Sequence, residues 1–126
     1  MIIGIGTDIV ETLRIEKSIE KNGKHFLDYV FTKVEQEYCS RKKNYESFAG
    51  RFAAKEAFVK AIGTGIGKEF GFKDIEIIND EYGKPLIKIN KNSSMLSKKH
   101  KIHLSISHSK LYATAFVVIE ILNEKD

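Results

Sequence analysis

The feature that most constrains this chain is the segment 48–62, where a helix-forming pattern sets one carboxylate among apolar and cationic side chains. At about 100° per residue, the large apolar side chains of a helix here gather into one stripe. The stripe consists of Phe48, Phe52, Val59 and Ile62. Glu56 falls beside it, near Lys60. An ionised carboxylate next to an apolar surface is costly unless a cation or a metal ion compensates its charge, so Glu56 either has a partner or marks a functional site.

Length and composition indicate one soluble globular domain. The 126 residues are 42% hydrophobic and 30% charged, which is ordinary for a folded domain with a single core. A core of this size leaves little stability to spare, which makes oligomerisation a plausible aid. No apolar run approaches the roughly 20 residues that span a bilayer, and the start of the chain lacks the charges of a signal peptide, so we expect a cytoplasmic protein that binds no membrane. Cys39 is the only cysteine, which excludes an intrachain disulfide, fits a reducing compartment and predicts an inert thiol.

The charge pattern is moderately basic. A formal net charge of +4 favours an acidic partner or a phosphorylated ligand without distinguishing the two. The basic clusters are Lys21 with Lys24, residues 41–43, and residues 98–101. Each cluster is either a solvated surface or a contact for an acidic protein surface or a polyphosphate.

The first half of the chain predicts one strand and three helices. Residues 2–10 form a short strand with glycines that allow close backbone approach, and a helix begins near Leu13 and breaks at residues 22–23. Residues 25–29 continue as helix or turn. Thr32 and Glu35 provide a capping box for a helix that runs to about residue 40. The longest helix spans residues 45–62 and ends at the glycines that follow.

The second half predicts two hairpins. Residues 75–78 and 86–89 pair as antiparallel strands across a turn-forming segment. Residues 93–99 are a candidate short helix. Residues 102–107 and 112–121 form a second hairpin.

Several polar residues are candidates for a phosphate or metal site. Asp8, at a strand end, and Glu56, on a helix, could converge to hold Mg²⁺ against phosphate oxygens. Otherwise, Asp8 caps the next segment and Glu56 pairs with Lys60 or Lys55. Arg51, Lys55 and Lys60 share the helix of Glu56 and would neutralise a bound diphosphate, or else form an exposed face.

A glycine-rich loop and a histidine are weaker candidates. Residues 63–67 follow a helix and lack the ending of a P-loop, so they terminate the helix or cradle a phosphate with backbone N–H groups. His108 lies where a strand meets a turn, where it binds phosphate, carries protons or bonds the backbone. Ser107 precedes it, but neighbouring residues of a strand point to opposite faces, so we set a serine hydrolase aside.

Three motifs together resemble those of a known family over essentially the whole chain. They are Gly4-Ile5-Gly6-Thr7-Asp8, Gly50-Arg51-Phe52-Ala53-Ala54-Lys55-Glu56-Ala57-Phe58-Val59-Lys60 with the glycines up to Gly67, and His103-Leu104-Ser105-Ile106-Ser107-His108. They closely resemble the short bacterial 4′-phosphopantetheinyl transferases, the holo-acyl-carrier-protein synthases.

The resemblance implies an activity and a set of site residues. A serine hydroxyl of an apo acyl carrier protein attacks the β-phosphate of coenzyme A and releases adenosine 3′,5′-bisphosphate, in the service of fatty acid biosynthesis. Asp8 and Glu56 match the family's Mg²⁺ ligands, and Lys60 would contact phosphate. The residues that would line the coenzyme pocket are Arg51, Gly65, Ser107 and His108. A water on the metal, Glu56 or His108 would take the serine proton; the residues alone leave all three open.

The resemblance also implies a fold and partners. The expected fold is α/β of the α+β type, one domain over residues 1–126, with a long helix packed on antiparallel strands. A homotrimer with active sites between subunits is expected. The acidic carrier would dock on the first helix, where the chain offers Arg14, Lys21 and Lys24. Two rivals are a small nucleic-acid-binding module, disfavoured because the aromatics have core spacing, and a different Mg²⁺-dependent phosphotransferase or diphosphate hydrolase. We therefore expect no nucleic-acid partner.

Overall fold

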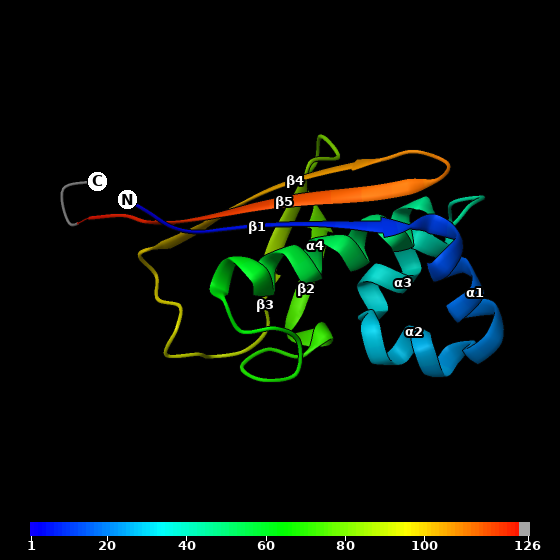
Figure 1. The fold of residues 1–126 in the computed structure, drawn as a ribbon, viewed down its shortest axis with the longest axis horizontal. Coiled ribbons are helices and arrows are strands. Elements are labelled where there is room, and N and C mark those ends of the chain that lie inside the picture. Colours follow the sequence, from blue (N-terminus) through cyan, green and yellow to red (C-terminus); the bar gives the residue numbers. More distant parts are fainter. Residues whose placement is uncertain (124–126) are drawn as a thin grey trace.

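A long central helix under a three-stranded antiparallel sheet organises the computed structural model, which describes residues 1–123 (Figure 1). The helix is α4 (Glu46–Ile62). The strands of the sheet, in spatial order, are β1 (Ile2–Glu11), β5 (Tyr112–Ile121) and β4 (His100–His108). A separate antiparallel hairpin consists of β2 (Ile75–Asn79) and β3 (Pro85–Ile89). The mixed fold with a long helix on antiparallel strands is therefore confirmed.

Three short helices gather at the end of the sheet where β1 finishes (Figure 1). They are α1 (Thr12–Asn22), α2 (Lys24–Val30) and α3 (Lys33–Ser40). A single turn of 3₁₀ helix, η1 (Phe72–Asp74), leads into β2. Gly23 separates α1 from α2 with a φ of 54°, a left-handed value that glycine adopts without strain.

Most predicted elements match the observed ones within a few residues, and one prediction is wrong. The capping box of Thr32 and Glu35 is present at the start of α3, and Gly63 ends α4 in the left-handed conformation. The candidate helix at residues 93–99 does not form, and this segment is a series of turns. The hydroxyl of Ser93 accepts the N–H of Met95, so local side-chain bonds compete with the helical ones.

The helix α4 is buried on nearly every side, whereas the sequence pattern predicted one apolar stripe. Its buried residues are Phe48, Ala49, Gly50, Arg51, Phe52, Ala53, Ala54, Lys55, Ala57, Phe58 and Val59. The sheet covers one side of the helix, and α1, α3 and β2 cover others. Phe72 of η1 also packs against Phe52 of α4. Small alanines allow this close approach, so α4 is the centre of the core.

Two glycines bring β1 into direct backbone contact with α4. A Cβ atom added to Gly6 would lie 2.0 Å from the carbonyl oxygen of Ala57, and one added to Gly4 would lie 2.1 Å from that of Ala61. No larger residue fits at either position without moving the strand from the helix. This contact sets Asp8, two residues after Gly6 on the same face of the strand, against the last turns of α4.

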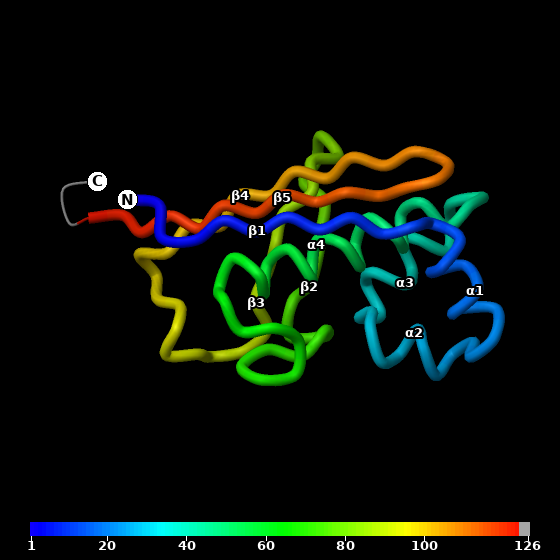
Figure 2. The backbone as a smooth tube through the Cα atoms, viewed as in Figure 1, coloured from blue at the N-terminus to red at the C-terminus, as the bar shows by residue number. Residues whose placement is uncertain are grey.

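The opposite face of the sheet is apolar and uncovered in the single chain. Ile5 is 58% exposed, Ile9 63% and Phe116 48%. The register pairs Ile5 with Val118 and Thr7 with Phe116, so these side chains lie together on one surface. Figure 2 shows the same three strands side by side along the outer edge of the molecule.

Candidate active site

Asp8 and Lys60 form an ion pair at the contact between β1 and α4. The Nζ atom of Lys60 lies 2.9 Å from Oδ1 of Asp8 and donates a second hydrogen bond to the carbonyl of Thr7 at 3.1 Å. The Asp8 side chain is 15% exposed, whereas that of Lys60 is 53% exposed. The carboxylate is thus held in place while the ammonium group is open to an incoming anion.

Glu56 lies near this pair without an ion pair of its own among the described residues. Lys60 pairs with Asp8 and Lys55 with Glu35, so neither of the cations considered for Glu56 neutralises it. Partial burial raises the pKa of the Glu56 carboxyl, and the negative charge of Asp8 raises it further. Lys60 and Arg14 act in the opposite direction. Two carboxylates that repel each other in a half-buried place are suited to a divalent cation.

The oxygen donors of the site are few. Residues 1–123 contain no group of three or more His, Cys, Asp or Glu side chains placed to hold a metal ion. The two carboxylates Asp8 and Glu56 supply oxygen ligands, and Mg²⁺ commonly takes its remaining ligands from water and substrate phosphates. The residues present therefore fit a cation that binds together with a phosphorylated substrate.

Lys55 does not join the cations of this site. Its side chain is fully buried on another side of α4, where the ammonium group contacts Glu35 at 2.6 Å. Arg51 is also buried, at 5% exposure. The suggestion that Arg51, Lys55 and Lys60 form one exposed cationic face is therefore wrong, because tertiary packing covers the first two.

Arg51 stands in a cleft at the other end of α4. One terminal nitrogen of its guanidinium donates to Oδ1 of Asn79, and the group lies 4.2 Å from the ring centroid of Tyr38. Its Nε atom is buried without a hydrogen-bond partner among the described residues. A buried guanidinium with an unused donor is suited to an anionic ligand.

His108 faces the same cleft from the end of β4. Its Nδ1 atom lies 3.0 Å from Oε1 of Glu46, and its ring lies over Gly50 of α4. The cleft has a volume of about 220 Å³. Its lining residues are Tyr38, Ser47, Gly50, Arg51, Asn79, Gly83, Pro85, Ile106 and His108.

The predicted site residues thus fall into two clusters that do not meet in one chain. Asp8, Glu56 and Lys60 form the first, which we call the carboxylate cluster; Arg51 and His108 form the second, which we call the arginine cleft. Arg51 and Glu56 are five residues apart on α4, which places them about 140° apart around the helix axis. The structure brings each cluster together but leaves them on different sides of the helix.

Ser107 and Gly65 lie outside both clusters. On β4, Ser107 lies two residues after Ser105, which pairs with Phe116 of β5. Side chains two residues apart share a face of a sheet, so the Ser107 side chain lies on the same uncovered face as Phe116. His108 points to the other face, which agrees with the exclusion of a serine hydrolase. Gly65 lies in the loop after α4 with a φ of 92° and open space around its α-carbon.

The first helix presents a basic hollow. Its volume is about 560 Å³. It is lined by Glu11, Leu13, Arg14, Lys17, Ser18, Lys21 and Asn22. Lys24, which the sequence assigned to the same helix, begins α2 and lies 3.6 Å from Asp28, so it does not line this hollow.

Some site residues were not predicted from the sequence. These residues are Glu46, at the start of α4, which holds His108, and Asn79, the last residue of β2, which holds Arg51. Nothing in their local pattern distinguishes them. Burial raises the pKa of the Cys39 thiol to about 11, as expected of an unreactive side chain.

None of the helices in residues 1–123 has the length and apolar character needed to cross a membrane.

Comparison with known proteins identifies the class to which this fold and these two clusters belong. A model of the 4′-phosphopantetheinyl transferase superfamily matches residues 4–117. The chain belongs to this superfamily, as its motifs predicted, and it is a transferase.

Individual relatives indicate which members of the superfamily this chain resembles. The holo-[acyl-carrier-protein] synthase of Halothermothrix orenii is 54% identical over 124 residues, which are 95% of this chain and 98% of that protein. The synthase of Clostridium novyi is 52% identical over 127 residues, which cover 98% of this chain and 91% of that protein. This chain is therefore similar to holo-[acyl-carrier-protein] synthases along nearly its full length.

Solved structures agree with the sequence relatives. A holo-(acyl-carrier-protein) synthase from Bacillus anthracis, in complex with CoA (3′,5′-ADP), superposes with a TM-score of 0.82 at 48% identity and covers 96% of this chain and 98% of that chain. The Helicobacter pylori synthase in complex with coenzyme A has a TM-score of 0.79 at 37% identity, with 92% and 99% covered.

Proposed function

We propose that this protein transfers the 4′-phosphopantetheinyl group of coenzyme A to a serine of an apo acyl carrier protein. The observation that carries the proposal is the carboxylate cluster, in a chain whose relatives are holo-[acyl-carrier-protein] synthases. We also propose that it works in the cytoplasm and serves fatty acid biosynthesis.

The transfer makes one phosphorus–oxygen bond and breaks another. The serine oxygen bonds to the β-phosphorus of coenzyme A, the bond from that phosphorus to the bridging oxygen breaks, and adenosine 3′,5′-bisphosphate leaves. Mg²⁺, which Asp8 and Glu56 would hold, supplies positive charge that offsets the charge on the diphosphate and its leaving group.

Lys60 neutralises and orients the diphosphate. Its exposed ammonium group is already fixed by Asp8 and the carbonyl of Thr7, so little conformational freedom is lost when a phosphate oxygen binds. The serine proton passes to a nearby base. Glu56, which lies beside Asp8 and Lys60, and His108 are the two side chains that could serve as this base.

The arginine cleft binds another part of coenzyme A. The buried guanidinium of Arg51 and the ring of His108 are suited to an anionic group of the coenzyme's nucleotide portion. Gly65 and Ser107 complete the pocket when a second copy of the chain covers the open face of the sheet.

We propose that the protein is a homotrimer with active sites between subunits. Two observations support this assembly: the apolar side chains of Ile5, Ile9 and Phe116 are exposed, and the two clusters lie on different sides of α4 within one chain. A neighbouring copy would cover the apolar face and bring its arginine cleft to the carboxylate cluster of the first.

The acidic carrier docks at the basic hollow of α1. Arg14 connects this hollow to the site, because it lines the hollow and its charge acts on Glu56. A carrier bound there would have its serine near the carboxylate cluster, and long-range attraction would speed its arrival.

One assay tests donor, acceptor and reaction together. The protein is incubated with apo acyl carrier protein, coenzyme A and Mg²⁺, and the carrier is weighed by mass spectrometry. We expect a gain of one phosphopantetheinyl group and equimolar adenosine 3′,5′-bisphosphate. Release of the bisphosphate with no gain in carrier mass would instead identify a diphosphate hydrolase. A gel shift with excess RNA or DNA, titrated with salt, would favour the nucleic-acid module.

A further inference from the structure

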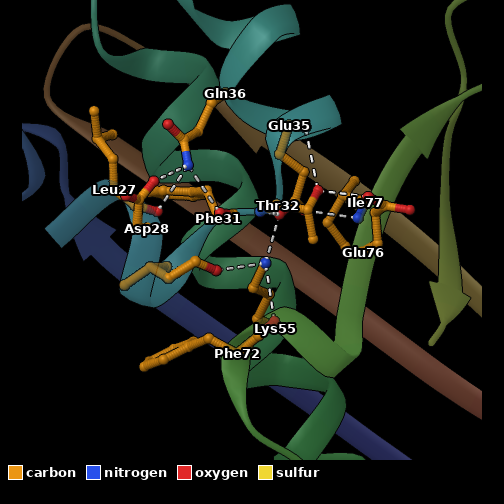
Figure 3. A network of polar contacts seen from close by, with 11 residues as sticks. Leu27, Asp28, Phe31, Thr32, Glu35, Gln36, Lys55, Phe72, Glu76 and Ile77 are labelled. Atoms are coloured by element: carbon orange, nitrogen blue, oxygen red, sulfur yellow. Dashed lines mark hydrogen bonds and ion pairs between the residues drawn. The ribbon is translucent and has the colours of Figure 1, made fainter. Parts of the chain in front are cut away.

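A fully buried lysine ammonium group lies at the junction of four elements (Figure 3). Lys55 of α4 donates to the carbonyl of Val30 at 2.7 Å, to Oε1 of Glu35 at 2.6 Å and to the carbonyl of Phe72 at 3.0 Å. These partners belong to the end of α2, to α3 and to η1. An ammonium group has three donors, and all three are used.

Glu35 extends the same network to two further backbone groups. Its Oε1 atom accepts the N–H of Thr32 at 2.9 Å, and its Oε2 atom accepts the N–H of Ile77 at 2.7 Å. Ile77 lies on β2, two residues before Asn79, whose side chain accepts a hydrogen bond from Arg51. The pair therefore connects α4 to the strand that supports the arginine cleft.

The Lys55–Glu35 pair restrains the rotation of α4 about its own axis. Lys55 immediately precedes Glu56, so the two side chains leave the helix about 100° apart. With side-chain tips about 5.5 Å from the axis, a rotation of about 10° would move the Glu56 carboxylate by about 1 Å. A displacement of that size near reacting groups is enough to lower a rate about 100-fold.

We propose that Glu35 and Lys55 are positioning residues for the transfer reaction: their buried, fully bonded pair fixes the rotation of α4 that directs Glu56 toward Asp8. This role rests on the proposed function, since it concerns the carboxylate cluster of the transferase. Gly4 and Gly6 set the distance between α4 and β1, and the pair sets the angle.

The directional bonds distinguish this role from ordinary stabilisation. Replacement of a buried ion pair by apolar residues of similar volume is often neutral or stabilising. An apolar pair would fill the same space, but it would not bond the carbonyls of Val30 and Phe72 or the N–H of Ile77. Loss of these bonds also costs stability, so the positioning role is tested by kcat and metal binding in protein that is shown to be folded.

The test compares two double variants that each leave the net charge unchanged. Glu35→Met with Lys55→Met removes the buried pair, and Glu37→Met with Arg41→Met removes the exposed ion pair of α3, which spans 2.8 Å. Measurements are melting temperature, kcat and KM for the carrier, and Mn²⁺ binding in the presence of coenzyme A by electron paramagnetic resonance.

In the buried-pair variant we expect kcat to fall about 10-fold to 100-fold and Mn²⁺ affinity to fall several-fold. The KM for the carrier should stay within about twofold, since α1 is outside the network. The exposed-pair variant should match the wild type. A folded buried-pair variant with wild-type kcat and Mn²⁺ affinity overturns the positioning role.

A second variant covers the case in which the apolar pair does not fold. Glu35→Asp keeps both charges but shortens the acid by one methylene, so α4 must shift or bonds must lengthen. At a temperature where circular dichroism shows it folded, we expect reduced kcat and Mn²⁺ affinity, and unchanged values contradict the proposal. The wild-type assay is run in parallel, because wild-type protein that leaves the carrier unmodified refutes the transferase function rather than the positioning role.

Discussion

The Nζ atom of Lys60 lies 2.9 Å from Oδ1 of Asp8, across 52 residues of chain. The pair joins a strand near the start of the chain to the last turn of the central helix. It leaves Glu56 without a cationic partner among the described residues, with its pKa raised by burial and by Asp8. The carboxylate cluster is therefore charged, half-buried and short of positive charge.

Removal of either carboxylate should abolish transfer while the fold persists. We expect Asp8→Ala and Glu56→Ala each to lower the rate of carrier modification at least about 100-fold, because each removes a ligand that would hold the cation over the diphosphate. Mass spectrometry of the carrier measures the rate and circular dichroism the fold. Glu81→Ala, at an exposed turn carboxylate, is the control and should retain full activity. Unimpaired turnover in both Ala variants would falsify the assignment of the two ligands.

Glu56 should weaken the metal-free fold as the pH rises. Its folded pKa is raised above the ordinary value of 4.5 by burial and by Asp8, so the folded state binds the proton more tightly than the unfolded state. The stability that this proton confers is fully present below pH 4.5 and is lost as the pH rises through the folded pKa. We expect Glu56→Gln, measured by urea unfolding in EDTA, to be more stable than the wild type at neutral pH.

The pH dependence of the stability difference between Glu56→Gln and the wild type tests the sign of this effect a second time. The advantage of Glu56→Gln should shrink as the pH falls toward 4.5, where the wild-type carboxyl also becomes neutral. An advantage that is constant across the pH range, or absent at neutral pH, argues against a raised pKa.

Gly6 should tolerate no larger residue. A Cβ atom at this position would lie 2.0 Å from the carbonyl oxygen of Ala57, so β1 or α4 must move. We expect Gly6→Ala to lower the free energy of unfolding by about 1–3 kcal/mol or more. Gly71→Ala is the control, because Gly71 has an extended backbone with a φ of −87°, and a Cβ atom there would meet only the Asp74 side chain at an ordinary 3.5 Å. Equal stability of the two variants would show that the strand does not pack on the helix backbone.

Two inactive variants should restore activity when assembled together. In the proposed trimer, a site combines Asp8 of one copy with Arg51 of the next, so Asp8→Ala and Arg51→Ala damage different contributions to it. Random mixed assembly in equal amounts leaves about a quarter of the sites intact. The two variants are refolded together and assayed against each alone, with the assembly size measured by light scattering. Mixed trimers without activity indicate that one chain supplies both residues.

Charge reversal on α1 should impair the carrier and spare the coenzyme. We expect Arg14→Glu with Lys21→Glu to raise the KM for the carrier at least about 10-fold, while coenzyme A binding by calorimetry persists. The wild-type KM should also rise with salt, because ions screen the attraction. Lys98→Glu with Lys101→Glu makes the same charge change away from α1 and should have little effect. Parallel loss of carrier and coenzyme binding contradicts a separate docking surface.

Local sequence patterns predicted the elements well where the signal was local. The capping box at Thr32, the glycine after α4 and the alternation of β4 and β5 depend on neighbours within a few residues, and each appears as predicted. The segment 93–99 failed because its helical pattern competes with serine side chains that bond their own backbone.

The sequence predicted only part of the candidate site. The structure places Asp8, Glu56 and Lys60 near one another, as a strand carboxylate and a helix carboxylate could converge, and their roles in the reaction stay predictions. The burial of Lys55 was not predicted, because a lysine on a helix has the same local pattern whether it meets solvent or three buried oxygen atoms. Glu35 was predicted as a helix cap, and its bond to Lys55 adds a role that capping chemistry does not reveal.

The sequence by itself determined the helices and strands, the glycines at close contacts and the family of this transferase, because these depend on residue type and short-range spacing. Only the tertiary structure decided which charges are buried, which carboxylates face each other and that the arginine cleft lies on another side of α4 from the carboxylate cluster. The physical reason is that burial and electrostatic environment arise from segments distant in the chain, whose meeting no local pattern records.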